Sequence, residues 1–134
     1  MKINTSPKTV NTNQEEVYNF LMDMNNFKEL FPSDKVEKWE ATSDNCSCKV
    51  KNMGTIELKR VASTPNSLIY LDSYGKTPFK FTLNLFISEK DTSSCNAHLE
   101  FDGEINPFMK MMLEKPLTEF FEKLVLRLVK KFEK

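Results

Sequence analysis

The chain has 134 residues with 19 basic and 19 acidic side chains, so its formal net charge is +0. A chain of this length builds one hydrophobic core, and we expect residues 1–134 to form a single domain. The balanced charge excludes the positive field of a typical nucleic-acid-binding protein, so we expect no nucleic-acid partner. The opening MKINTSPK lacks the apolar core of a signal peptide, and no later run reaches about 18 apolar residues. We therefore expect a cytoplasmic protein without a membrane span.

The first expected element is a strand over residues 2–10, in which Pro7 indicates a sheet edge or a bulge. Asn13 and Glu16 follow with the spacing of a capping box, which predicts the start of a short helix. A second short helical stretch ends at Pro32, because the residue before a proline is biased away from helical geometry. Helices this short must pack on a sheet to be stable.

Between residues 35 and 104 apolar and polar residues alternate, and turn signals recur about every ten residues. This pattern predicts six strands, at 35–43, 46–51, 55–63, 68–74, 78–89 and 93–104.

Short turns rich in Asp, Asn and Gly fix the expected register of these strands. They place Val50 opposite Trp39 on one side and opposite Ile56 on the other. The following turn places Arg60 opposite Leu71. Because one face stays apolar through every turn, we predict an antiparallel meander with one covered face. Including the first strand, its order is 1-7-6-5-4-3-2.

The last third of the chain predicts a long amphipathic helix. Asn106 is a good N-cap and Pro107 suits the first helical position. Apolar residues then recur at three- and four-residue steps as far as Phe132, which gives about seven turns. Pro116 interrupts this run and predicts a kink that opens space between helix and sheet. The fold class is therefore α+β, with seven antiparallel strands, two short helices between the first two strands, and one long C-terminal helix.

Three stretches extend this pattern: NTNQEEVYNFL at the first helix, PFKFTLNLFI in the clearest strand, and DGEINPFMKMM before the last helix. Together with the element order they resemble the START/pollen-allergen (SRPBCC) superfamily, which includes polyketide cyclase/dehydrase-like and lipid-transfer proteins. The resemblance implies a helix-grip fold over the whole chain, in which a curved sheet grips the C-terminal helix around an apolar cavity. The glycine-rich loop of the allergen branch is absent, and a tight turn stands at residues 43–46.

No group of residues in this register forms a catalytic constellation. His98 falls on the outer face of the sheet, away from any cavity. Cys46 and Cys48 lie two apart on one strand, about 7 Å from each other, which is too far for an unstrained disulfide. With Cys95 they suit small buried hydrophobic residues better than a metal site. We expect no metal, no cofactor and three reduced thiols.

Two residues on the covered face leave alternatives open. Trp39 is either ordinary core or an aromatic wall of the cavity. Arg60 shares the face of Ile56 and Leu58, where an unpaired guanidinium is costly to bury. Either a bulge at Arg60 and Val61 brings it to a rim position, or it meets a ligand carboxylate or an internal acid.

These observations predict a protein that binds a hydrophobic small molecule, lipid-like or polycyclic, between the sheet and the C-terminal helix. The alternatives are a cyclase/dehydrase-like enzyme and a protein-interaction module of the co-chaperone kind. The methionines that open the last helix would close one end of the cavity or simply fill gaps. The oligomeric state, monomer or weak dimer, is left open. The residues expected to contact the ligand are Trp39, Ile56, Leu58, Arg60, Leu71, Phe79, Phe81, Leu83, Phe101, Met112, Leu113, Leu117 and Phe120.

Overall fold

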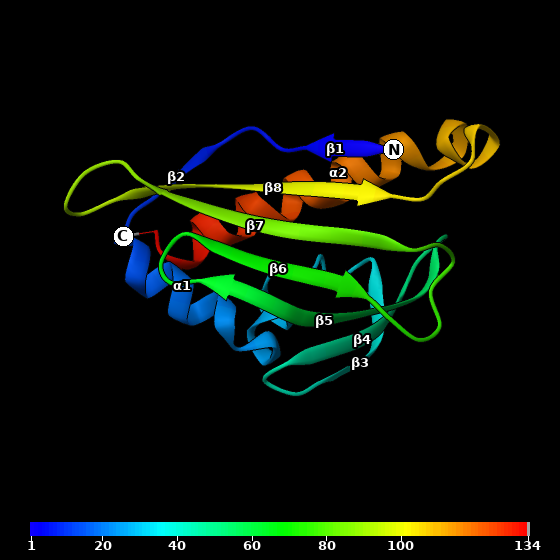
Figure 1. The fold of residues 1–134 in the computed structure, drawn as a ribbon, viewed down its shortest axis with the longest axis horizontal. Helices are drawn as coiled ribbons and strands as arrows, with labels where there is room; N and C mark the ends of the chain where they lie inside the picture. The colour runs from blue at the N-terminus through cyan, green and yellow to red at the C-terminus, as the bar shows by residue number, and fades with distance from the viewer. Residues whose placement is uncertain (134) are drawn as a thin grey trace.

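The computed structural model describes residues 1–133, and its central feature is an antiparallel sheet that curves around the C-terminal helix (Figure 1). The sheet order is β1-β8-β7-β6-β5-β4-β3, and β2 pairs with β8 beside β1. This confirms the predicted order and the helix-grip arrangement. The strands are β1 (Lys2–Asn4), β2 (Lys8–Val10), β3 (Val36–Ala41), β4 (Asn45–Val50), β5 (Gly54–Thr64), β6 (Leu68–Ser73), β7 (Phe81–Glu89) and β8 (Cys95–Gly103).

The strand count is eight because the expected first strand is divided. Its two halves, β1 and β2, both pair with β8, and residues 5–7 separate them. Pro7 has no N–H for the ladder, which fits the interruption at this edge.

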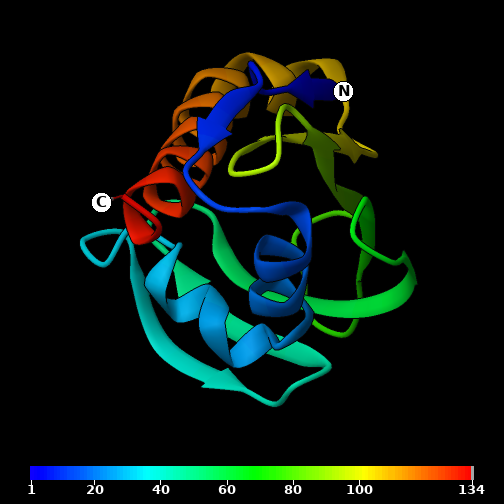
Figure 2. The ribbon, with the colours of Figure 1, turned by 90° about the vertical axis from the view of Figure 1, so that its left-hand side faces the viewer.

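The helices begin where the sequence signals them. The Asn13 side chain accepts a hydrogen bond from the Glu16 N–H at 2.9 Å and caps α1 (Gln14–Met22). Asp23 then caps a 3₁₀ helix, η1 (Met24–Glu29). Asn106 accepts from the Met109 N–H at 2.8 Å and caps α2 (Pro107–Lys131). Figure 2 shows α1, η1 and α2 together on the concave side of the sheet. In residues 1–133 no helix is long and apolar enough to cross a bilayer.

The expected register around β4 is wrong by two residues. Val50 pairs with Gly54 instead of Ile56, and on the other side it pairs with Val36 instead of Trp39. The turns lie earlier in the chain than expected, and a bulge in β3 at Lys38, whose φ is +55°, absorbs a further residue. Because the shift between β4 and β5 is an even number of residues, the apolar face of β4 is still the buried one.

A bulge at Val61 interrupts β5. Arg60 pairs with Leu71 as expected, but Ala62 pairs with Tyr70, so Val61 has no partner across the strand. Val61 is exposed, and the last residues of β5 beyond it are exposed as well. This bulge is one of the two alternatives raised by the position of Arg60.

The core lies between the concave face of the sheet and the helices. Alternate residues of β7 and β8 point into it, and Leu83 and Phe101 are fully buried there. From α2 the buried residues are Leu117, Phe120, Phe121, Leu124, Val125 and Leu128. These positions confirm which face of the meander is covered.

Candidate functional site

A small apolar void lies between the sheet and α2. Its volume is about 30 Å³, close to the volume that one water molecule occupies in the liquid. Every lining side chain is apolar. They are Ile56, Leu58, Phe79, Phe81, Leu83 and Phe101 from the sheet side, Leu117, Phe120 and Phe121 from α2, Phe31 after η1, and Val50 and Met53 around the β4–β5 turn.

Aromatic rings fill most of the space around this void. The Phe101 and Phe121 centroids are 5.0 Å apart. Phe31 meets Phe120 edge-on, with centroids 5.4 Å apart and planes at 75°. Such edge-to-face pairs add roughly 0.5–1.5 kcal/mol to simple burial. The resting interior is therefore packed, and a guest larger than a water molecule has to displace rings.

A groove opens at the surface next to the void. Its volume is about 340 Å³, and it shares Val50, Met53 and Phe120 with the lining of the void. The remaining lining residues are Pro32, Lys35, Lys51, Asn52, Met112, Leu113, Pro116, Glu119 and Lys123. The α2 helix continues past Pro116 and ends at Lys131. The groove lies beside this proline, where the sequence predicts open space.

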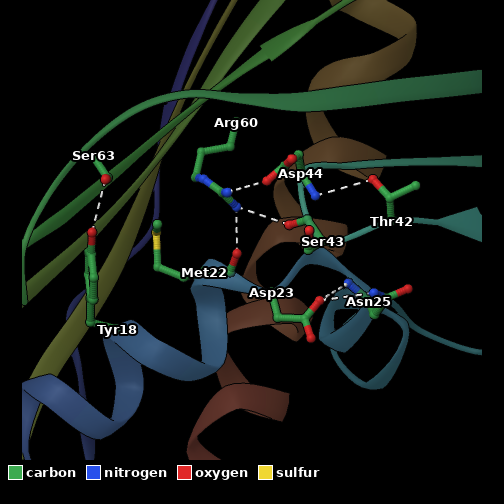
Figure 3. Close-up of polar contacts among 9 residues, drawn as sticks. All are labelled: Tyr18, Met22, Asp23, Asn25, Thr42, Ser43, Asp44, Arg60 and Ser63. Atoms are coloured by element: carbon green, nitrogen blue, oxygen red, sulfur yellow. Dashed lines mark hydrogen bonds and ion pairs between the residues drawn. The ribbon is translucent and has the colours of Figure 1, made fainter.

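Arg60 is engaged away from both spaces, at the C-terminal end of α1 (Figure 3). Its guanidinium pairs with the Asp44 carboxylate and donates to the carbonyls of Met22 and, at 3.0 Å, Ser43. Asp44 lies in the β3–β4 turn and its side chain is 69% exposed, so it is not an internal acid, and the bulge with a rim position is the alternative that holds for Arg60. Arg60 lines neither the void nor the groove.

Two more of the expected contact residues lie outside the lining. Trp39 is half-buried and packs edge-on against Phe31, with centroids 5.4 Å apart. It therefore supports the wall without forming it. Leu71 is fully buried on the covered face but does not line the void, whereas Leu83, its partner on β7, does.

The methionines at the start of α2 do not line the void, although Met109 packs against the core. Met111 is 86% exposed, and Met112 is 60% exposed and lines only the groove. Phe108 is 72% exposed on the same first turns. The first turns of the helix precede its buried residues, which begin at Leu117. A methionine-rich stretch of sequence alone does not show whether its side chains line a cavity or lie on the protein surface.

The three cysteines are buried in the covered face. Burial, and secondarily the neighbouring Cys48, raises the pKa of Cys46 to about 12, and burial raises the pKa of Cys48 to about 11. Burial also raises the pKa of Cys95. Thiols of this kind are poor nucleophiles and poor metal ligands at neutral pH.

His98 lies on the outer face, as expected. Its ring stacks on Phe86 with centroids 4.7 Å apart, and its Nε2 is 3.0 Å from a Glu100 carboxylate oxygen. The sheet separates this pair from the void.

The lining includes residues that sequence reasoning missed. Phe31, Val50, Met53 and Phe121 line the void, and three lysines line the groove. Phe121 follows the apolar spacing of α2 and was available from that pattern. Met53 was assigned to a turn, and a turn residue carries no periodicity that shows which way it points.

No family model matches the sequence, and no curated protein matches it. Solved structures do match over nearly the whole chain. A START superfamily protein from Mycobacterium smegmatis aligns with a TM-score of 0.77 at 14% identity, covering 98% of this chain and 96% of that one. The chain has a START-type helix-grip fold.

Two further structures support this fold. A truncated norcoclaurine synthase from Thalictrum flavum has a TM-score of 0.77 at 11% identity, covering 98% of this chain and 92% of that one. A conserved protein from Geobacillus kaustophilus has a TM-score of 0.74 at 12% identity, covering 98% and 95%. Since function resides in sites grafted on folds, these similarities at low identity establish the START-type architecture and no activity.

Proposed function

We propose that this protein binds a hydrophobic small molecule, lipid-like or polycyclic, between the sheet and α2. The observation that supports this most is the apolar void that shares Val50, Met53 and Phe120 with an open groove. Ligand sites in proteins are typically concave, mostly apolar and few per molecule.

Binding requires the interior to open, because a void of about 30 Å³ admits no such ligand. Met53 is half-buried at the boundary and has a flexible, unbranched side chain that repacks easily. Phe120 stands beside it on α2. Displacement of these two side chains enlarges the void toward the groove without breaking a hydrogen bond.

The residues that contact the ligand follow from this opening of the void toward the groove. The ligand body contacts Ile56, Leu58, Phe79, Phe81, Leu83, Phe101, Leu117 and Phe120 inside, and Met112 and Leu113 at the groove. Phe31, Val50, Met53 and Phe121 join them. Affinity comes from apolar area at roughly 25 cal/mol per Å², less the cost of ordering the ligand and moving side chains.

The protein performs little or no chemistry on this ligand. One structurally similar protein is a norcoclaurine synthase, but general acid–base catalysis needs a titratable group within reach of the substrate. The lining of the void, where the ligand body lies, is wholly apolar, and the titratable groups Lys35, Lys51, Glu119 and Lys123 line only the outer groove.

A second candidate function is favoured by one observation. Phe108, Met111 and Met112 are exposed three and four residues apart at the start of α2, and a contiguous exposed apolar patch often marks a protein contact. In this alternative the first turns of α2 dock on a partner protein and the interior stays closed.

The test uses the neutral dye Nile red, followed by fluorescence. We expect one dye per chain, displaced by lipid-like or polycyclic compounds. Leu83→Trp and Met53→Trp narrow the interior and its boundary, so both weaken dye binding while the circular dichroism spectrum is retained. Phe108→Ser and Met111→Ser serve as controls and leave binding unchanged.

The opposite pattern contradicts the proposal. If binding is lost in the two serine variants and kept in the two tryptophan variants, the dye binds the exposed start of α2. The interaction function then replaces the binding function.

A further inference from the structure

The charges around the groove are uneven. Lys35, Lys51 and Lys123 contribute basic groups to its lining, and Glu119 contributes the one acid. Among residues 1–133, none of these three ammonium groups lies within 4.0 Å of a carboxylate. The groove therefore has a positive rim above an apolar floor.

The three lysines come from different parts of the chain. Lys35 precedes β3, Lys51 lies in the β4–β5 turn and Lys123 is on α2. The Lys51 N–H donates to the Lys35 carbonyl at 2.8 Å, which ties the first two segments together. Asn52, next in the turn, has φ +67°, a left-handed conformation that asparagine tolerates better than most residues. The backbone of two of the lysines is thus fixed.

The floor between them leads to the interior. Met53 follows Lys51 by two residues and lines both spaces, and Phe120 precedes Lys123 by three residues on α2. Residues three apart on a helix share a face. A molecule whose apolar end lies between Met53 and Phe120 therefore has its other end among the lysines.

From this arrangement we infer that the ligand is an amphipathic anion. Its apolar body enters between Met53 and Phe120, and its carboxylate, phosphate or sulfate head is held by Lys35, Lys51 and Lys123. This inference rests on the binding function proposed above and names its ligand class. Arg60 is not the anion's partner, because Asp44 already occupies its guanidinium.

The experiment compares ligands that share one chain and differ in the head: decanoate, decyl phosphate, decyl sulfate and neutral decanol, each displacing Nile red below its micelle concentration. We expect the anions to bind on the order of tenfold more tightly than decanol, as for a few exposed ion pairs acting together. High salt reduces this preference, because mobile ions screen exposed charges. The order among the three anions distinguishes a carboxylate ligand from a phosphate or sulfate ligand.

Two triple variants separate the effect of the groove lysines from the effect of the protein's net charge. Lys35→Gln, Lys51→Gln and Lys123→Gln together abolish the preference for anions and leave decanol binding unchanged. Lys2→Gln, Lys76→Gln and Lys130→Gln remove the same charge outside the groove and keep the preference.

Each other outcome has a definite meaning. If decanol and the anions bind equally to the native chain, or if both triple variants behave alike, the inference about the head group is overturned while the binding function stands. If no member of the series displaces the dye and the dye itself does not bind, the proposed function fails and this inference fails with it.

Discussion

Arg60 and Asp44 form an ion pair whose two members are unequally exposed. The Arg60 side chain is 18% exposed and that of Asp44 is 69% exposed. Arg60 also donates to the Met22 carbonyl at the end of α1, where the last carbonyls of a helix lack intrahelical partners. The pair therefore joins the β3–β4 turn to the end of α1. Arg60 contributes more to the free energy of unfolding than Asp44 does.

We expect Arg60→Ala to lower the free energy of unfolding by about 1–3 kcal/mol, because it removes the donor to a partly buried carbonyl. Asp44→Ala removes an exposed partner and costs under about 1 kcal/mol. Urea unfolding of both variants measures the difference. An equal loss in the two variants would show that the ion pair alone matters.

The buried thiols make stability fall at alkaline pH. The pKa of Cys46 rises from 9.0 to about 12 and that of Cys48 from 9.0 to about 11, so the folded state holds these protons more tightly than the unfolded chain. Their contribution is complete below pH 9 and is lost as the pH rises toward the folded pKa values. Between about pH 9 and about pH 10 the loss is on the order of 1 kcal/mol per thiol.

The control is the double variant Cys46→Ala and Cys48→Ala. Its stability is expected to depend less on pH over this interval, although its absolute stability is lower. Parallel pH curves for the two proteins would contradict the assignment. A thiol reagent is further expected to find three free groups per unfolded chain and to react slowly with the folded protein.

Gly103 leaves room for the Phe101 ring. A Cβ at this position would lie 2.7 Å from Phe101 Cζ and 3.2 Å from Ile105 Cδ1. Gly103→Ala therefore pushes Phe101 toward the void, and we expect a loss of about 1–3 kcal/mol from overpacking. Nile red binding should weaken as well. Gly54→Ala is the control, because nothing lies within 4 Å of its added Cβ and only the strain of φ +94° remains. Unchanged dye binding in Gly103→Ala would contradict a displaced Phe101.

The two faces of α2 should respond differently to substitution. Leu117 is buried against the void, so Leu117→Ala is expected to cost about 2–5 kcal/mol in unfolding free energy. Met111→Ser lies on the exposed face and is expected to change stability by no more than about 0.5 kcal/mol. Thermal unfolding measures both. A large loss in Met111→Ser would mean that a partner or second copy covers this face in solution.

The sequence predicts the architecture well because alternate residues of a strand point to opposite faces of the sheet. Which side chains are covered therefore depends only on whether a residue is an even or an odd number of positions from a covered one. Moving the β4–β5 turn by one residue shifted the partner of Val50 by two residues and so did not change the side on which Val50 lies. The same reasoning placed His98 outside and Leu83 inside. Periodicity records which face a residue occupies.

Periodicity does not record how full the interior is. Ten of the thirteen expected contact residues line the void or the groove, but Trp39, Arg60 and Leu71 lie outside the lining. Whether a void exists depends on how rings such as Phe31 and Phe101 pack against each other across the core. The spacing of residues along the chain does not show this packing. Turn residues such as Met53 lack any alternation that would have placed them at the site.

Both edges of the sheet are interrupted: residues 5–7 separate β1 from β2 at one edge, and a bulge at Lys38 breaks β3 at the other. An unpaired edge strand offers its free N–H and C=O groups to any extended chain that approaches it. Here each edge presents only a short regular segment, and β3 also carries the charges of Glu37, Lys38 and Glu40. A second molecule therefore finds little straight backbone to extend the sheet. The protein is in this way protected against strand-to-strand aggregation at high concentration.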